Sequence, residues 1–133
     1  MDIHKKEICM LSTSGSRQIA VAIVGFIFAG MYLWPIPYKD VSMGGGFLLG
    51  WLIAAAIAGC LSRLFLRQSI ILTASLISVG FAAATMARVI VDCSVDPTNH
   101  NLWPFEIGFA VFVGWPGGLI GALTAWKVKP VNS

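Results

Sequence analysis

Four long apolar stretches take up most of this 133-residue chain, and they limit its fold more than any other feature. They cover residues 19–34, 43–62, 70–91 and 102–126. A helix needs about 20 residues to cross the hydrocarbon core of a bilayer, so each stretch can cross once if the short first one recruits its neighbours. Backbone groups in lipid must satisfy one another, which requires helices. The sequence therefore predicts an all-α membrane protein with four transmembrane helices in a compact bundle.

The composition argues against most soluble classes of protein. Charged residues make up 11% of the chain and hydrophobic residues 57%, whereas a soluble domain has about 25% charged residues. This balance excludes an ordinary soluble enzyme, a disordered chain and a nucleic-acid binder with a broad basic face. Four spans leave no room for a separate soluble domain, so we expect residues 1–133 to form one transmembrane domain that begins with a polar tail at 1–17. The expected partner is the lipid bilayer rather than nucleic acid.

The cysteines and histidines predict no cofactor. Cys9, Cys60 and Cys93 form no Cys-x-x-Cys pair, which argues against a thiol oxidase and against a disulfide framework. His4 and His100 are expected on opposite sides of the membrane, so they cannot hold one haem together.

The basic residues predict the orientation of the chain. With the N-terminus inside, the inner segments contain Lys5, Lys6, Arg17, Arg63, Arg67, Lys127 and Lys129. The outer segments contain Lys39, and Arg88 lies near the outer end of the third stretch. Because cytoplasmic loops carry the excess of Lys and Arg, we expect both termini in the cytoplasm. The small size and compactness of the chain suggest the inner membrane of a bacterial cell.

Small residues indicate where the predicted helices meet. Lipid provides no hydrophobic drive for helices to associate, so close approach at small side chains holds them together. The first and third stretches carry Ala22, Gly25, Ala29, Ser75, Ser78, Ala82 and Thr85. The second stretch carries a row of Gly46, Gly50, Ala54 and Ala58, and the fourth carries Gly114, Gly117, Gly118 and Gly121. These rows predict tight packing, either within the chain or between copies of it.

Pro116 interrupts the fourth stretch near its middle. Proline removes one backbone hydrogen bond of a helix, so we expect a kink or a local opening there. Two interpretations remain for Pro116 and its neighbours Gly114, Gly117 and Gly118. One is a hinge or a broken helix around a substrate, as in some transporters. The other is a static kink that fits a neighbouring helix.

Polar residues at the outer ends of the third and fourth stretches form the candidate binding site. They are Arg88, Asp92, Asp96, His100 and Glu106. Residues four apart share one face of a helix, which favours a pair of Arg88 and Asp92. Asp96-Pro97 is a turn signal, so we expect the helix to end before Pro97 and His100 to approach from the loop.

Each of these residues also has a purely structural interpretation. Arg88 can reach the interface by snorkelling and pair with Asp92. Glu106 falls in a first helical turn, where the helix dipole favours an anion. Whether the cluster binds a metal ion stays open, because carboxylates and imidazole suit divalent cations but no established ligand spacing is present. No serine or cysteine nucleophile motif accompanies His100, so binding is favoured over catalysis.

Three functions are compatible with these features. The first is a small membrane protein that binds or transports a small ligand or ion through an outward-facing polar site between the third and fourth helices. The second is a non-enzymatic accessory or immunity-type subunit of a larger membrane complex. The third is a small lipid-modifying enzyme. A transporter of this size is expected to form a homo-oligomer, whereas an accessory subunit is expected to co-purify with a different chain.

Overall fold

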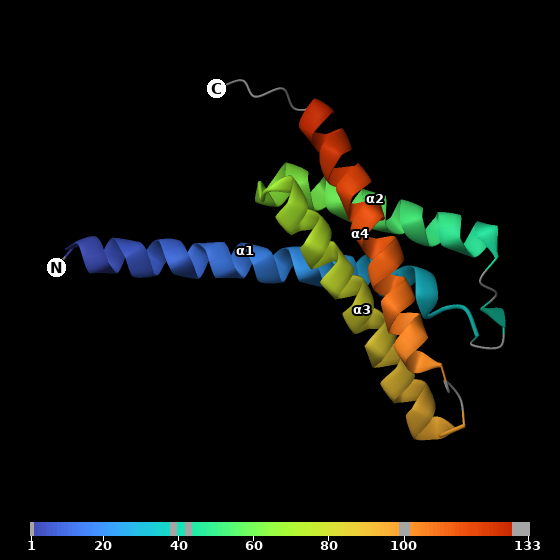
Figure 1. The fold of residues 1–133 in the computed structure, drawn as a ribbon. Coiled ribbons are helices and arrows are strands. Elements are labelled where there is room, and N and C mark those ends of the chain that lie inside the picture. The colour runs from blue at the N-terminus through green and yellow to red at the C-terminus, as the bar shows by residue number, and fades with distance from the viewer. Residues whose placement is uncertain (1, 38–39, 42–43, 99–101, 129–133) are drawn as a thin grey trace.

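The computed structural model of this chain is all-helical (Figure 1). It describes residues 2–37, 40–41, 44–98 and 102–128, with side chains from residue 13 onward. Within these residues the helices are α1 (Asp2–Leu33), α2 (Gly45–Leu66), α3 (Ile70–Val95) and α4 (Trp103–Val128). Each contains a segment long and apolar enough to cross a membrane. The prediction of four packed apolar helices is confirmed.

The helices extend beyond the apolar stretches at several ends. α1 begins at Asp2, so the backbone of the predicted tail at 1–17 is helical over nearly its whole length. α2 continues through Arg63 to Leu66, and α3 continues through Asp92 to Val95. Hydropathy marks where a helix can contact lipid, but a charged residue near a helix end does not stop the helix. A cation in the last turn of α2, such as Arg63, even suits the negative end of the helix dipole.

Specific residues terminate the helices. Arg67 adopts a left-handed conformation (φ 51°) and donates its backbone N–H to the Arg63 carbonyl, which closes α2. Ser69 then caps α3, because its side chain accepts a hydrogen bond from the Leu72 amide at 3.3 Å. α3 ends at Val95, before Pro97, as predicted. The connection between α2 and α3 is therefore limited to Arg67, Gln68 and Ser69.

The helices form a bundle of two crossing hairpins. α3 packs against α1 and α4, and α2 packs against α4 and α1. α1 and α4 lie at opposite corners and have no contact in the described part of the chain. Figure 1 shows the hairpin of α1 and α2 crossing the hairpin of α3 and α4 obliquely, and the N-terminal part of α1 extending away from the other helices. The end of α1 meets the last third of α3 on one side of the bundle, where the candidate site lies.

Glycines allow the backbones of this chain to touch one another. A Cβ at Gly121 would collide with the Ala56 carbonyl of α2, and one at Gly80 would collide with the Ala22 carbonyl of α1. A Cβ at Gly117 would lie 2.9 Å from the Leu52 carbonyl oxygen. Small residues of these helices thus provide packing within the chain. α4 itself is continuous from Trp103 to Val128, so the helix is not broken at Pro116.

The packing row of α2 differs from the predicted one. Gly46 is exposed and a Cβ there would meet nothing within 4 Å. The residues that α2 buries are Trp51, Ala55, Ala58, Gly59 and Ser62. Ala58 of the predicted row is buried, and a Cβ at Gly50 would collide with the Tyr32 side chain of α1, whereas Gly46 makes no such contact. Trp51 packs on Phe47, Phe81 and Phe109 with ring centroids 5.5, 5.6 and 6.2 Å away.

The outside of the bundle is largely apolar. Between 28% and 44% of the apolar segment of each helix is buried inside the structure. More than half of every segment therefore lies on the outside of the bundle. α1, for example, exposes Ile19, Ile23, Ile27 and Met31 at four-residue spacing along one face. A soluble monomer rarely leaves apolar patches of this extent in water. Such a surface is typical of a multi-pass membrane protein.

Candidate functional site

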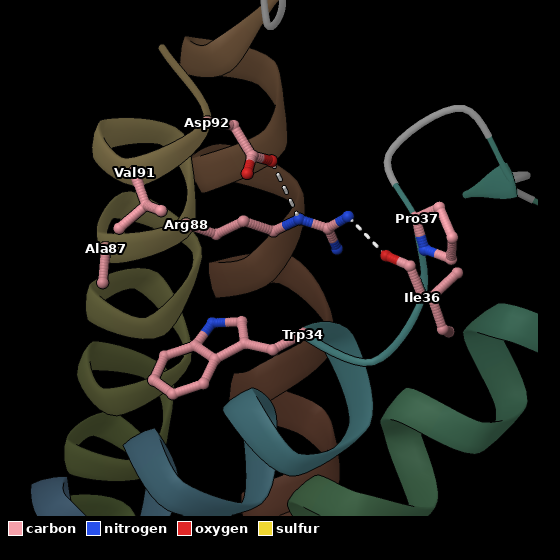
Figure 2. Close-up of a pocket in the computed structure, with 7 residues that line it drawn as sticks. All are labelled: Trp34, Ile36, Pro37, Ala87, Arg88, Val91 and Asp92. Carbon is pink, nitrogen blue, oxygen red and sulfur yellow. Dashed lines mark hydrogen bonds and ion pairs between the residues drawn. The ribbon is translucent and has the colours of Figure 1, made fainter. Parts of the chain in front are cut away.

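One pocket combines an apolar lining with charged groups. It has a volume of about 570 Å³ and lies between the last third of α3 and the segment that follows α1. Its lining residues are Trp34, Ile36, Pro37, Ala87, Arg88, Val91 and Asp92. Figure 2 shows the Arg88 side chain reaching from α3 toward Ile36, with Trp34 and Asp92 on either side of it.

Arg88 connects α3 to the end of α1. Its Nη1 donates to the Leu33 carbonyl oxygen at 2.7 Å, and its Nη2 donates to the Ile36 carbonyl oxygen at 2.6 Å. Its Nε lies 3.4 Å from the Asp92 carboxylate, one turn further along α3. The residue is buried, with 8% of its surface exposed. The predicted Arg88–Asp92 pair is therefore present, but the arginine does not snorkel freely to the interface.

Physical chemistry explains this arrangement. The last carbonyls of a helix lack intrahelical partners and carry the negative end of the dipole. Leu33 is the last residue of α1, and Pro35 and Pro37 prevent the helix from continuing. The Arg88 guanidinium supplies donors and a positive charge at that end. Its two contacts with carbonyl oxygens are short, whereas the contact with Asp92 is long for a charge-assisted hydrogen bond.

Trp34 makes a second connection between the same two elements. Its indole N–H donates to the Ala84 carbonyl oxygen of α3 at 3.3 Å. The ring packs edge-on against Phe26 of α1, with centroids 5.4 Å apart. Trp34 is half-exposed, so one part of the indole stays available at the pocket. Together, Arg88 and Trp34 hold the residues after α1 against α3 and so build the pocket wall.

The other predicted site residues lie outside this pocket. Asp96 is fully exposed and accepts hydrogen bonds from the hydroxyl and the amide of Thr98, which lower the pKa of its carboxyl group. Glu106 lies in the first turn of α4, as its structural interpretation required, and is half-buried. His100 falls outside the described residues. Neither Asp96 nor Glu106 lines the pocket. Among the described residues no three His, Cys, Asp or Glu side chains could hold a metal ion together.

The structure adds lining residues that the sequence did not single out as a site. Ile36, Pro37, Ala87 and Val91 give the pocket its apolar walls. Pro35 and Pro37 prevent α1 from continuing, but nothing in the sequence indicated that this end of the helix would meet Arg88. The pocket consequently lies between α3 and the α1–α2 connection, whereas the prediction placed a site between the third and fourth helices.

The chain was compared with known proteins at three levels. It matches no family model, no curated protein and no solved structure.

Proposed function

We propose that this chain is a multi-pass protein of a bacterial inner membrane that binds a small amphipathic molecule in the pocket between α3 and the segment after α1. The observation that carries this proposal is the combination of the Arg88–Asp92 pair with apolar walls in one pocket. The volume of about 570 Å³ falls within the roughly 300–1,000 Å³ of small-molecule sites. We propose further that the protein transports the same molecule across the membrane.

The chemistry of the pocket favours binding over catalysis. Most of its lining residues are apolar, and its charged groups are a buried guanidinium and a partly exposed carboxylate. The Arg88 guanidinium offers hydrogen-bond donors and no acceptor, so it serves to orient a ligand. Few polar groups placed among apolar walls are typical of sites that recognise a molecule by shape and orientation.

Filling the pocket is expected to abolish binding. Ala87 lines the pocket, and Ala83, one turn earlier on α3, is exposed elsewhere. The purified protein would be incubated with an equimolar mixture of phosphatidylethanolamine and phosphatidylglycerol in mild detergent, and total bound lipid would be measured by native mass spectrometry. Ala87→Phe should lower the total at least tenfold, as a steric cost of at least about 1.4 kcal/mol implies.

Ala83→Phe is the matched control and should bind lipid like the unchanged protein. Far-UV circular dichroism of both variants reports whether the helices remain folded. Equal total binding by a folded Ala87→Phe variant would overturn the proposal. A stable complex with a different protein that forms equally well with the Ala87→Phe variant would favour the accessory-subunit function instead.

The proposed orientation places both termini in the cytoplasm. Its support is the distribution of basic residues, since Arg63, Arg67 and Lys127 all lie at the end of the bundle opposite Arg88. A green fluorescent protein fused after residue 133 is expected to fluoresce, and alkaline phosphatase at the same position is expected to be inactive. Active phosphatase at that position would reverse the assignment.

A further inference from the structure

The pocket wall carries one positive and one negative group side by side. Arg88 and Asp92 lie one turn apart on α3, with Nε and the carboxylate oxygen separated by 3.4 Å. Their charges sum to zero. A ligand with a single charge would bring that charge near one wall group of the same sign, which opposes binding. The wall therefore suits a ligand that itself carries both charges.

The mouth of the pocket faces the apolar outside of the bundle. Trp34 and Val91, which line it, are at least half-exposed. Met31, one turn before Trp34, and Ile90, next to Val91, are exposed apolar residues as well. In a membrane-embedded bundle this surface contacts lipid. A ligand reaches the pocket most directly from within the bilayer, with an apolar part that stays at the mouth.

Both charged groups retain capacity for a ligand. A guanidinium has five N–H groups, and Arg88 uses three of them on Leu33, Ile36 and Asp92 within the described part of the chain. The remaining two suit a phosphate oxygen. Asp92 takes part in an interaction besides its ion pair with Arg88, and an ionised carboxylate offers about four acceptor positions. It can therefore also accept a hydrogen bond from an ammonium group.

We propose that the pocket binds a membrane phospholipid whose headgroup carries both a phosphate and a primary ammonium group, as phosphatidylethanolamine does. The phosphate lies at Arg88, the ammonium lies at Asp92, and the glycerol and first acyl carbons lie against Trp34 and Val91. This inference rests on the proposed function and names the ligand class of the same pocket.

The experiment measures headgroup preference in the same lipid mixture. The unchanged protein should retain phosphatidylethanolamine over phosphatidylglycerol of the same acyl composition by about tenfold, the effect of one charge-assisted contact. Asp92→Asn removes the negative wall group and preserves the shape, so it should reduce the ratio to about one or below, with total lipid retained. Soluble glycerophosphoethanolamine at the lipid concentration should displace nothing, because it has no acyl chains to hold it.

The outcomes separate this inference from the proposed function. Equal retention of the two lipids, with total binding still abolished by Ala87→Phe, would overturn the headgroup assignment and leave an amphiphile site. An unchanged preference in Asp92→Asn would overturn the role of that carboxylate. Displacement by glycerophosphoethanolamine would overturn the lipid as ligand. If Ala87→Phe leaves the total amount of bound lipid unchanged, both proposals are overturned together.

Discussion

Gly121→Ala is expected to destabilise the bundle by about 3 kcal/mol, the upper part of the usual range for an overpacked interior. The added Cβ would collide with the Ala56 carbonyl oxygen and would lie 2.8 Å from the Cys60 backbone nitrogen. Both belong to the α2 backbone, which cannot rotate away as a side chain can. α2 and α4 must separate, and contacts along their whole crossing weaken. Unfolding by SDS in mixed micelles, followed by far-UV circular dichroism, measures this loss.

Two other glycines of α4 provide matched controls. A Cβ at Gly108 would meet nothing within 4 Å, so Gly108→Ala should stabilise the helix by roughly 0.5–1 kcal/mol through its better helix propensity. A Cβ at Gly118 would lie 3.1 Å from the Ala74 Cα and 3.2 Å from the Ile77 Cβ. The stability of Gly118→Ala should therefore lie between those of Gly121→Ala and Gly108→Ala. Equal stability of Gly121→Ala and Gly108→Ala would show that α2 and α4 do not meet as closely as the structure has them.

The sequence was sufficient to predict the helices because lipid removes most alternatives. A long apolar stretch has only one way to satisfy its backbone, so four such stretches gave four helices. The ends were harder to predict. Hydropathy alone ended the second stretch at residue 62, but α2 continues through Arg63 to Leu66. Asp96-Pro97 predicted the end of α3 correctly, because proline acts on backbone geometry rather than on hydropathy.

The packing faces were predicted where small residues make the contact and were missed where a large side chain makes it. Gly25 and Ala29 of α1 and Gly121 of α4 are buried at helix contacts, as their spacing indicated. In α2, Gly50 and Ala58 of the predicted row lie at helix contacts, but Gly46 is exposed, and the row did not include the buried Trp51. A search for small residues alone cannot find a face that is built around an aromatic ring.

The candidate site could be predicted only as far as a single helix extends. The Arg88–Asp92 pair follows from four-residue spacing on α3. The partners that bury Arg88 are the carbonyls of Leu33 and Ile36, more than fifty positions away in the chain. Backbone carbonyls have no signature in a sequence, because every residue has one. The pocket depends on how α1 ends against α3, which is a tertiary property.

Arg88→Met is expected to destabilise the protein by about 3 kcal/mol, because two hydrogen bonds from a charged group, each worth roughly 1.5–3 kcal/mol, are lost. Methionine preserves most of the side-chain length but donates no hydrogen bond. The Leu33 and Ile36 carbonyls then lose the Arg88 donors, and the residues after α1 lose one of their two connections to α3. The SDS unfolding assay measures the global loss. Hydrogen exchange of the Trp34 and Ile36 amides should increase, since the local connection is broken.

The part played by Asp92 in this effect can be separated from that of the carbonyls. Asp92→Asn should cost about 1 kcal/mol or less, because an ion pair with a partly exposed partner contributes little. The coupling energy between Arg88→Met and Asp92→Asn should accordingly be small beside the loss in Arg88→Met alone. A coupling energy as large as that loss would mean that Arg88 acts through Asp92. The two short hydrogen bonds to Leu33 and Ile36, set against the 3.4 Å separation from Asp92, argue for the carbonyls, and hence for Arg88 as the residue that fixes the end of α1 on α3.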